Sequence, residues 1–249
     1  MKILALIPAR MASSRFPGKP MAKILGKPMI GHVYERVFRA PLLDTVAVAT
    51  CDQEIVNYIE SIGGTAVMTS DRHERASDRC AEALLKLEEV KGVRYDIVVM
   101  VQGDEPMIHP DMIAEAVQPL LDDANVQVVN LLGRIKDDAE FEDRNCIKVV
   151  CDLDSNALYF SREPIPTRCK ADTIPMGKQV CIIPFRRDYL LAYTRMTPTP
   201  LEVVESVDMM RILEHGMKVR MAPTSHDTQA VDTPQDLARV EVLMRTTNG

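Results

Sequence analysis

The chain has 249 residues, of which 46% are hydrophobic, and this is enough for one α/β domain with a sizeable core. Its formal net charge of −6 argues against nucleic acid or an anionic membrane as a partner. No window reaches the roughly 18 apolar residues of a spanning helix, and only five apolar residues follow Lys2, too few for a signal peptide. We therefore expect a cytoplasmic protein with no membrane partner.

Strand and helix patterns alternate in the first half of the chain, where short apolar runs are followed by apolar residues at helical spacing. Strands are expected at residues 3–7, 45–50, 66–68, 97–101 and 126–132. Helices are expected at residues 29–39, 53–62, 77–89 and 110–121. This order predicts a mostly parallel, Rossmann-like sheet between two layers of helices. Ligands of such sheets bind beyond the carboxyl ends of the strands, where Arg10, Asp52 and Asp104 are expected.

The pattern changes after about residue 140. A pair of strands at 148–152 and 157–161 is predicted around a hairpin turn, and residues 163–178, with three prolines, are predicted to form an irregular loop. Further along, we expect strands at 180–185 and 219–222, and helices at 189–194, 202–216 and 234–246. The sequence thus predicts one α/β domain over residues 1–249, with an excursion at about 140–200 that forms a smaller, partly antiparallel subdomain.

The loop after the first strand carries Arg10, Arg15 and Lys19 within ten consecutive residues. Free backbone N–H groups and fixed positive charge on such a loop are suited to holding a polyphosphate. The loop has neither the G-x-x-x-x-G-K-[ST] nor the G-x-G-x-x-G spacing, so side chains are expected to bind the phosphates. An ordinary basic surface loop is the alternative interpretation of this composition.

Asp104 and Asp232 are the acidic pair with the strongest case for a role in catalysis. Each follows an apolar strand, and each is followed closely by a proline that fixes the loop. Two carboxylates from distant segments can share a Mg²⁺ ion that also binds phosphate oxygens. For Asp232, a cap at the N-terminus of the last helix is the alternative interpretation.

Seven motifs together resemble the sugar-activating nucleotidyltransferases: Ile-Pro-Ala-Arg at 7–10, Ser-Arg at 14–15, Pro-Gly-Lys-Pro at 17–20, Gly-Lys-Pro-Met-Ile at 26–30, Val-Gln-Gly-Asp-Glu-Pro at 101–106, Ala-Leu-Tyr-Phe-Ser-Arg at 157–162 and Val-Asp-Thr-Pro-Gln-Asp-Leu at 231–237. Within that superfamily the chain looks most like the 3-deoxy-manno-octulosonate cytidylyltransferases, or CMP-Kdo synthetases. The resemblance covers nearly the whole chain. It implies transfer of CMP from CTP to the anomeric hydroxyl of a 3-deoxy-2-keto sugar acid, release of pyrophosphate, Mg²⁺ as cofactor and a homodimer.

The resemblance also assigns roles to individual residues. The catalytic residues implied are Arg10, Lys19 and Asp104. Those implied for the nucleotide are Ala9, Arg10, Ser14, Arg15, Lys19, Ser77, Arg79 and Gln102. Those implied for the sugar acid are Gln102, Tyr159, Arg162, Gln179, Glu202 and Glu205. The Mg²⁺ ligands implied are Asp104 and Asp232. Solvated helix faces remain an equal interpretation for the two glutamates. The dimer interface is expected in residues 140–200, where strands outside the parallel sheet would leave apolar edges.

Two stretches depart from the family pattern. The family carries Ser-Gly-Thr where this chain has Arg75-Ala76-Ser77, and a His-Leu-Gly-Ile-Tyr-like strand where residues 179–183 read Gln-Val-Cys-Ile-Ile. In the first stretch, Ala76 narrows the space beside the base and Arg75 adds charge, which bears on the selection of cytosine. In the second, a site that loses hydrogen-bonding groups and gains bulk should prefer a different or smaller acid, so we expect an acceptor other than ordinary Kdo. A nucleotidyltransferase with another acceptor or base, and a non-catalytic nucleotide-binding homologue, are the alternatives.

Overall fold

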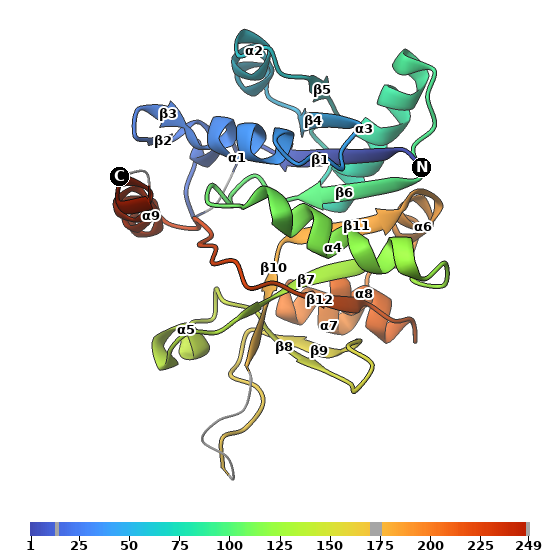
Figure 1. Cartoon of the computed structure of the whole chain (residues 1–249), viewed down its shortest axis with the longest axis vertical. Helices are drawn as coiled ribbons and strands as arrows, with labels where there is room; N and C mark the ends of the chain where they lie inside the picture. The colour runs from blue at the N-terminus through green and yellow to red at the C-terminus, as the bar shows by residue number, and fades with distance from the viewer. Residues whose placement is uncertain (13–14, 170–175, 248–249) are drawn as a thin grey trace.

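The computed structural model describes residues 1–12, 15–169 and 176–247, and its centre is a five-stranded sheet. Four strands of this sheet are parallel, and the fifth, β11, runs antiparallel at one edge beside β6 (Figure 1). In spatial order the strands are β11 (Ile182–Arg186), β6 (Ile97–Val101), β1 (Ile3–Ala9), β4 (Thr45–Thr50) and β5 (Ala66–Met68). The predicted mostly parallel α/β class is confirmed.

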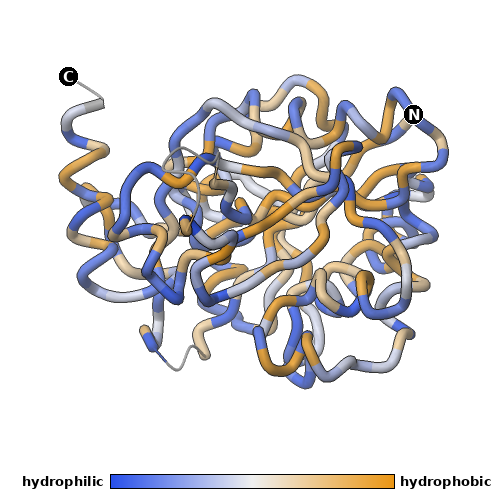
Figure 2. The backbone as a smooth tube through the Cα atoms, turned by 90° about the horizontal axis from the view of Figure 1, so that it is seen from below, coloured by the Kyte–Doolittle hydropathy of each residue, from blue (hydrophilic) through white to orange (hydrophobic). Residues whose placement is uncertain are grey.

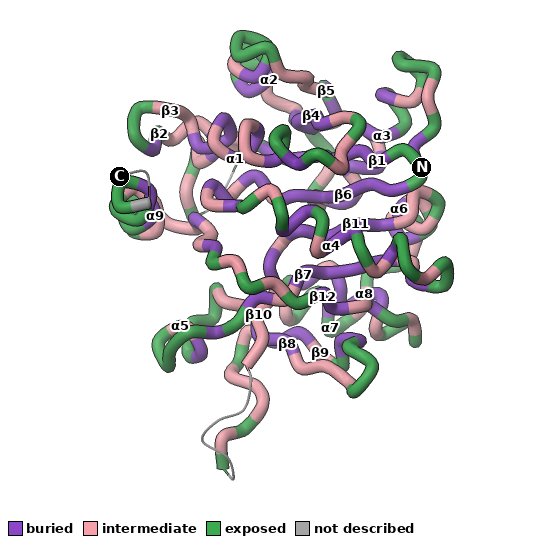
Figure 3. Tube along the Cα trace, in the orientation of Figure 1, coloured by how far each residue is buried: buried purple, intermediate pink, exposed green. Residues whose placement is uncertain are grey.

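Helices cover both faces of this sheet because its strands are apolar on both sides. Alternate residues of β1 enter two different hydrophobic clusters, with Ile3, Ala5 and Ile7 in one and Leu4 and Leu6 in the other. The first cluster is completed by α1 (Met29–Phe38), α2 (Gln53–Ser61) and α4 (Pro110–Asp122). The second is completed by α3 (Ala76–Lys91), α6 (Arg187–Tyr193) and α8 (Met209–Glu214). Apolar, buried strands therefore fill the middle layer (Figures 2 and 3).

A second five-stranded sheet lies beside the first. Its spatial order is β12 (Arg220–Pro223), β7 (Val129–Arg134), β10 (Gly177–Val180), β8 (Lys148–Cys151) and β9 (Ala157–Ser161). Only the β12–β7 pair is parallel. The prediction that the strand near residues 126–132 joins the parallel sheet is wrong for β7, because β11 occupies the edge beside β6. The segment meets this sheet through an isolated antiparallel bridge from Val128 to Phe185 of β11, and β7 itself pairs in the second sheet.

The single strand predicted at 180–185 is also wrong, since the chain crosses between the two sheets at Cys181. Residues up to Val180 pair with β7 and β8, whereas Ile182 and its successors pair with β6. Both Val180 and Ile182 are fully buried, so the apolar run continues unbroken through the crossing. The hydrophobic periodicity of the sequence therefore does not reveal that the chain changes sheets at Cys181.

The helix predicted at 202–216 is divided into α7 (Pro200–Glu205) and α8 by Ser206, whose φ of 53° is left-handed. The Arg162 guanidinium donates to the carbonyls of Glu205 and Ser206 and so holds this break from outside the helix. No helix of the described residues is long and apolar enough to cross a membrane.

The shorter elements complete the chain. These are η1 (Lys19–Met21), β2 (Lys23–Ile24), β3 (Lys27–Pro28), α5 (Asp138–Glu142) and α9 (Pro234–Thr247). The last helix stands apart from both sheets in Figure 1, where it packs on the β2–β3 region through a small cluster that includes Ile24 and Val240. Its position brings Asp232, just before the helix, to the loop that follows β1.

Candidate active site

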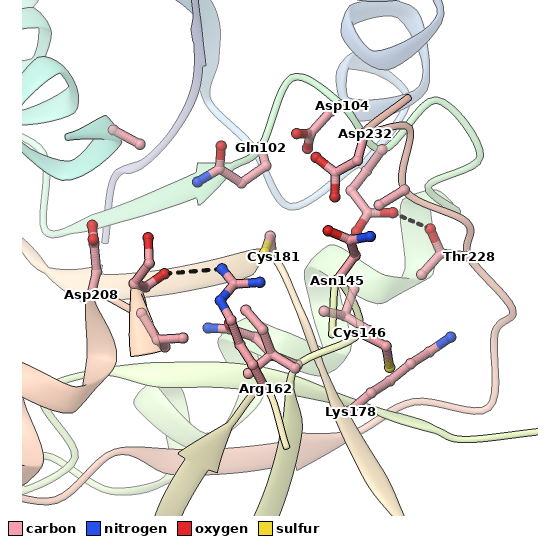
Figure 4. A pocket seen from close by; sticks show the side chains of 18 of the residues that line it. Gln102, Asp104, Asn145, Cys146, Arg162, Lys178, Cys181, Asp208, Thr228 and Asp232 are labelled. Carbon is pink, nitrogen blue, oxygen red and sulfur yellow. Dashed lines mark hydrogen bonds between the residues drawn. The ribbon is translucent and has the colours of Figure 1, made fainter. Parts of the chain in front are cut away.

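A large cavity lies at the carboxyl ends of β1 and β6, opposite the β10–β11 crossing. Its volume is about 1180 Å³, above the roughly 300–1,000 Å³ of common small-molecule sites. The walls come from both sheets, from the start of α3, from the α7–α8 break and from the segment before α9. Many of the lining side chains in Figure 4 are charged. The cavity therefore has room for a nucleotide together with a second polar substrate.

The basic loop after β1 reaches this cavity. Arg10 and Arg15 line it, and Ala9, the last residue of β1, also contributes to the wall. Asp52 accepts a hydrogen bond from the Met11 backbone N–H at 2.8 Å, so Asp52 holds the loop and is not part of the described lining. The predicted nucleotide residue Ser14 lies outside the described residues.

Asp104 and Asp232 converge on one cation. The Lys19 ammonium lies 2.7 Å from an Asp104 oxygen and 3.6 Å from an Asp232 oxygen. Arg15 makes a second contact to Asp232, at 2.8 Å. Magnesium is commonly bound by one or two carboxylates together with substrate phosphates, so the carboxylate pair fits that ion. Lys19 is not among the residues that line the cavity, and it reaches the site through its contacts with the two carboxylates.

The residues next to Asp232 cap the last helix, so Asp232 itself is not the capping residue. Asp236 N donates to the Thr233 hydroxyl at 3.2 Å, and Asp236 accepts from the Thr233 backbone N–H at 2.9 Å. This reciprocal pair is a capping box, with Thr233 in the capping position. The Asp232 carboxylate is thus left to face Arg15 and Lys19 at the cavity.

Glu105 is a cavity residue that the sequence reasoning missed. It is buried, accepts a hydrogen bond from the Thr228 hydroxyl, and has its pKa raised to about 7 by burial, with Asp104 and Asp232 adding to the shift. The sequence feature that could have indicated Glu105 is its place directly after Asp104 in the 101–106 motif. Gly103 comes just before Asp104, and a Cβ at this position would lie 2.9 Å from the Pro8 carbonyl oxygen. Glycine therefore permits the loop after β6 to approach β1 closely.

Arg162 lines the cavity, with much of its guanidinium already engaged by the protein. It donates to the carbonyls of Glu205 at 2.6 Å, Arg144 at 2.9 Å and Ser206 at 3.3 Å. A guanidinium has five N–H donors, so within the described part of the chain one N–H on each terminal nitrogen is left for a ligand. Arg162 therefore stabilises the α7–α8 break by hydrogen bonds and also places a positive charge at the cavity wall.

Tyr159 and Glu205 support Arg162 and are not part of the described cavity wall. The Tyr159 hydroxyl donates to Glu205 at 3.1 Å, and the other Glu205 oxygen accepts from the Arg162 backbone N–H at 2.8 Å. Glu202 does reach the wall, but its carboxylate is bound by Arg211 at 2.6 and 2.7 Å and by Arg75 at 3.1 Å. These contacts occupy the carboxylates that the resemblance assigns to the sugar.

Two of the predicted nucleotide residues, Arg79 and Ser77, are hydrogen-bonded to other groups of the protein, whereas Gln102 is directed into the cavity. Arg79 lines the cavity, but its guanidinium donates to the Thr69 hydroxyl at 2.6 Å and to the Ser70 carbonyl at 3.2 Å. Ser77 is buried outside the described wall and donates to Asp208, which lines the cavity. The Gln102 amide projects into the cavity in Figure 4.

The residues that depart from the family pattern are brought together at this cavity. Arg75, Ala76, Gln179, Cys181 and Ile183 all line it. Arg75 is the N-cap residue of α3, and its guanidinium contacts Glu202. The Gln179 amide donates to the buried Asn130 at 2.7 Å. The wall therefore differs chemically from the pattern implied by the resemblance.

Comparisons with known proteins show the family to which the chain belongs. A family described as Cytidylyltransferase matches residues 4–219. The 3-deoxy-manno-octulosonate cytidylyltransferases of Geobacter metallireducens and Syntrophus aciditrophicus are 45% and 43% identical to the chain, over 96% and 98% of it and 96% and 97% of their own lengths. The structure of a CMP:2-keto-3-deoxy-manno-octonic acid synthetase complexed with CTP superimposes with a TM-score of 0.90 at 38% identity, covering 99% of this chain and 100% of the other.

A more distant structure, a cytidylyltransferase from Leptospira borgpetersenii, has a TM-score of 0.66 at 18% identity and shares the fold. It covers 99% of this chain and 87% of its own. The fold and the cavity thus define a cytidylyltransferase. More narrowly, the chain belongs to the 3-deoxy-manno-octulosonate cytidylyltransferase family. The prediction of an enzyme of this class is confirmed.

Replacing Lys19 or Arg15 by alanine should lower kcat with CTP by about a hundredfold, the usual effect of removing one donor that stabilises developing charge. Lys19 holds Asp104 and Asp232 together, and Arg15 lies at the cavity wall, so either loss should weaken the stabilisation of negative charge in the transition state. Steady-state kinetics with varied CTP measures this effect. Lys23→Ala, an exposed neighbour on β2, is the control, and normal kinetics in both loop variants would refute the phosphate role.

Proposed function

We propose that the enzyme transfers CMP from CTP to the anomeric hydroxyl of a 3-deoxy-2-keto sugar acid, with Mg²⁺ bound and pyrophosphate released. The observation that carries this proposal is the convergence of Asp104 and Asp232 on one cation, beside a loop of arginines. The names of the relatives support cytidylyl transfer to 3-deoxy-manno-octulosonate, or Kdo.

The residues of the chain position the reactants and balance their charge, which is most of what this reaction requires. Arg10 and Arg15 offer guanidinium donors to phosphate oxygens at the cavity wall. Asp104 and Asp232 would hold Mg²⁺, which when bound neutralises phosphate charge and polarises the α-phosphate. Transfer to a hydroxyl requires no covalent enzyme intermediate, so the cysteines at the cavity need no role in it.

Arg162 is proposed to bind the carboxylate of the acceptor through its remaining N–H donors. A guanidinium matches a carboxylate with two parallel hydrogen bonds, and lysine cannot supply that geometry. Arg162→Lys is therefore expected to raise the KM for the acceptor at least about tenfold, since charge-assisted hydrogen bonds contribute about 1.5–3 kcal/mol each, and to leave the KM for CTP nearly unchanged.

Varied-acceptor kinetics at saturating CTP checks this result. Because Arg162 also binds three carbonyls, the melting temperature of the variant is measured alongside. Arg144→Lys, at an exposed arginine in the same region, is the matched control. An unchanged acceptor KM in a folded Arg162→Lys variant would contradict the proposal that Arg162 binds the carboxylate of the acceptor.

A second candidate is transfer to an acid other than Kdo, and the cavity wall favours it. Gln179, Cys181 and Ile183, the departures expected beside the sugar, all line the cavity. Pyrophosphate release with each of four nucleoside triphosphates against a panel of sugar acids tests both candidates. Activity with CTP and a close Kdo analogue above that with Kdo supports the second. Kdo as the best acceptor supports the first alone, and an acceptor without a carboxylate contradicts both.

We also propose a homodimer through the region of residues 140–200. Leu153 and Leu158 on the β8–β9 hairpin are exposed apolar side chains within this region. Val203 and Val204, also exposed, lie next to it on α7, which the Tyr159–Glu205 hydrogen bond places beside β9. Sedimentation of the wild type against Leu158→Asp tests this interface. A monomeric wild type would contradict it.

A further inference from the structure

A second group of metal-ligating side chains lies outside the described lining of the cavity. His109 precedes α4, and Asp111 and Glu115 lie on its first turns, while His226 comes from the segment between β12 and α9. One ligand atom from each of His109, Asp111 and His226 lies within 4.8 Å of the others. The imidazoles stack with centroids 4.2 Å apart and an interplanar angle of 8°.

Glu115 supplies an independent indication of a cation here. One of its oxygens lies 3.8 Å from His226 Nε2, and the same nitrogen is 4.0 Å from Asp111. The other Glu115 oxygen is buried and has no hydrogen-bond partner among the described residues. Leaving a buried carboxylate oxygen unpaired is costly, so such an atom in a native structure calls for an explanation. A cation bound beside it would provide one.

We propose that His109, His226, Asp111 and Glu115 bind one divalent transition-metal ion of the Zn²⁺ class. Two imidazoles with carboxylates suit zinc, nickel or copper, whereas Mg²⁺ and Ca²⁺ prefer oxygen ligands alone. Tetrahedral zinc places its ligand atoms roughly 3.3 Å apart, so the three clustered side chains must close on the ion. The parallel imidazole rings must also turn out of their stack, because a metal ion lies in the plane of each ring that binds it. His109 and Asp111, 48% and 68% exposed, have the freedom to do so.

The ion would connect the two segments that carry the catalytic carboxylates. The loop from Asp104 to His109 and the segment from His226 to Asp232 are already joined where Val231 N donates to the Asp104 carbonyl at 2.9 Å and where Thr228 donates to Glu105. A metal ion between His109 and His226 adds a third connection on the outer side. It thereby limits the relative movement of Asp104 and Asp232. Metal binding itself does not depend on the proposed transfer reaction. The functional importance of restricting Asp104 and Asp232 does rest on that proposed function.

Calorimetric titration of the metal-stripped enzyme with Zn²⁺, in saturating Mg²⁺ to fill the Asp104–Asp232 site, tests the proposal. One equivalent per chain is expected to bind and to raise the melting temperature. His109→Ala and His226→Ala should each weaken binding at least about tenfold, because even an indirect supporting residue commonly contributes that much. His215→Ala, a histidine outside the cluster, is the matched control and should bind as the wild type does.

Cobalt(II) spectroscopy and one inactive variant make the outcome decisive. A Co²⁺ spectrum without thiolate charge-transfer bands is expected, and such bands would assign the ion to the cysteines and overturn the proposal. The Asp104→Asn variant should lose activity but keep its full equivalent of Zn²⁺. If it loses the metal, the ion belonged to the cavity and the inference is wrong. Binding that survives in the His109→Ala/His226→Ala double variant, or no binding to the wild type, also overturns it.

Discussion

Replacing Asp104 by asparagine is expected to lower the rate of CMP transfer by about a thousandfold or more while the protein stays folded. Asn keeps the shape of the side chain but removes the negative charge that the structure pairs with Lys19 at 2.7 Å. Without that charge the site binds a divalent ion less tightly and leaves the Lys19 ammonium without one of its two carboxylates. The measurement is kcat at saturating CTP, acceptor and Mg²⁺.

Asp122→Asn is the matched control for this prediction. Asp122 is exposed on α4, and among the described residues its carboxylate accepts one hydrogen bond, from Gln118, which asparagine can still accept. Circular dichroism checks that both variants are folded. An Asp104→Asn enzyme that keeps more than about a tenth of the wild-type rate would refute the metal assignment.

The parallel sheet could be predicted because its signals are local. The apolar strands β1, β4 and β6 are each short and bounded by polar residues, and helical spacing lies between them. Topology rules then place the residues after such strands at one edge. Arg10 and Asp104 are brought to one cavity on this basis.

The second sheet could not be predicted because sheet membership is decided far away in the chain. Nothing in residues 126–134 reveals that β11 already occupies the free edge beside β6. In the same way, an apolar run through Cys181 is compatible with one strand or with two strands in different sheets. The α7–α8 break at Ser206 is held by Arg162, more than forty residues earlier.

The same limit applies to the site. The family resemblance singled out Arg162 and Glu202 as polar residues near the acceptor, but their bonding partners come from other segments. The pairing of Glu105 with Thr228 and the stacking of His109 on His226 also join distant segments. Motifs identified which residues are chemically notable, and only the packed structure shows which of their bonds are already made.

Glu202→Gln is expected to destabilise the folded enzyme by about 3–5 kcal/mol, the usual cost of breaking a buried ion pair from one side. The side chains of Arg211 and Glu202 are only 1% and 4% exposed, and they make a bidentate contact at 2.6 and 2.7 Å. Glutamine preserves the volume but leaves the Arg211 charge buried beside the ring of Tyr193 without a carboxylate.

Urea unfolding measures the loss, with the midpoint converted to free energy at a constant slope. Glu241→Gln is the control, because Glu241 also pairs with an arginine, Arg245, but on the exposed face of α9. An exposed pair of this kind contributes only about 0.3–0.5 kcal/mol. A Glu202 variant that loses no more than this control would show that Arg211 does not need the carboxylate. Glu202 would then be available to a ligand in the cavity, as its place in the resemblance implies. The expected large loss would instead assign Glu202 to the folding of the α7–α8 region, where it pairs with Arg211 and with Arg75 at the cavity wall.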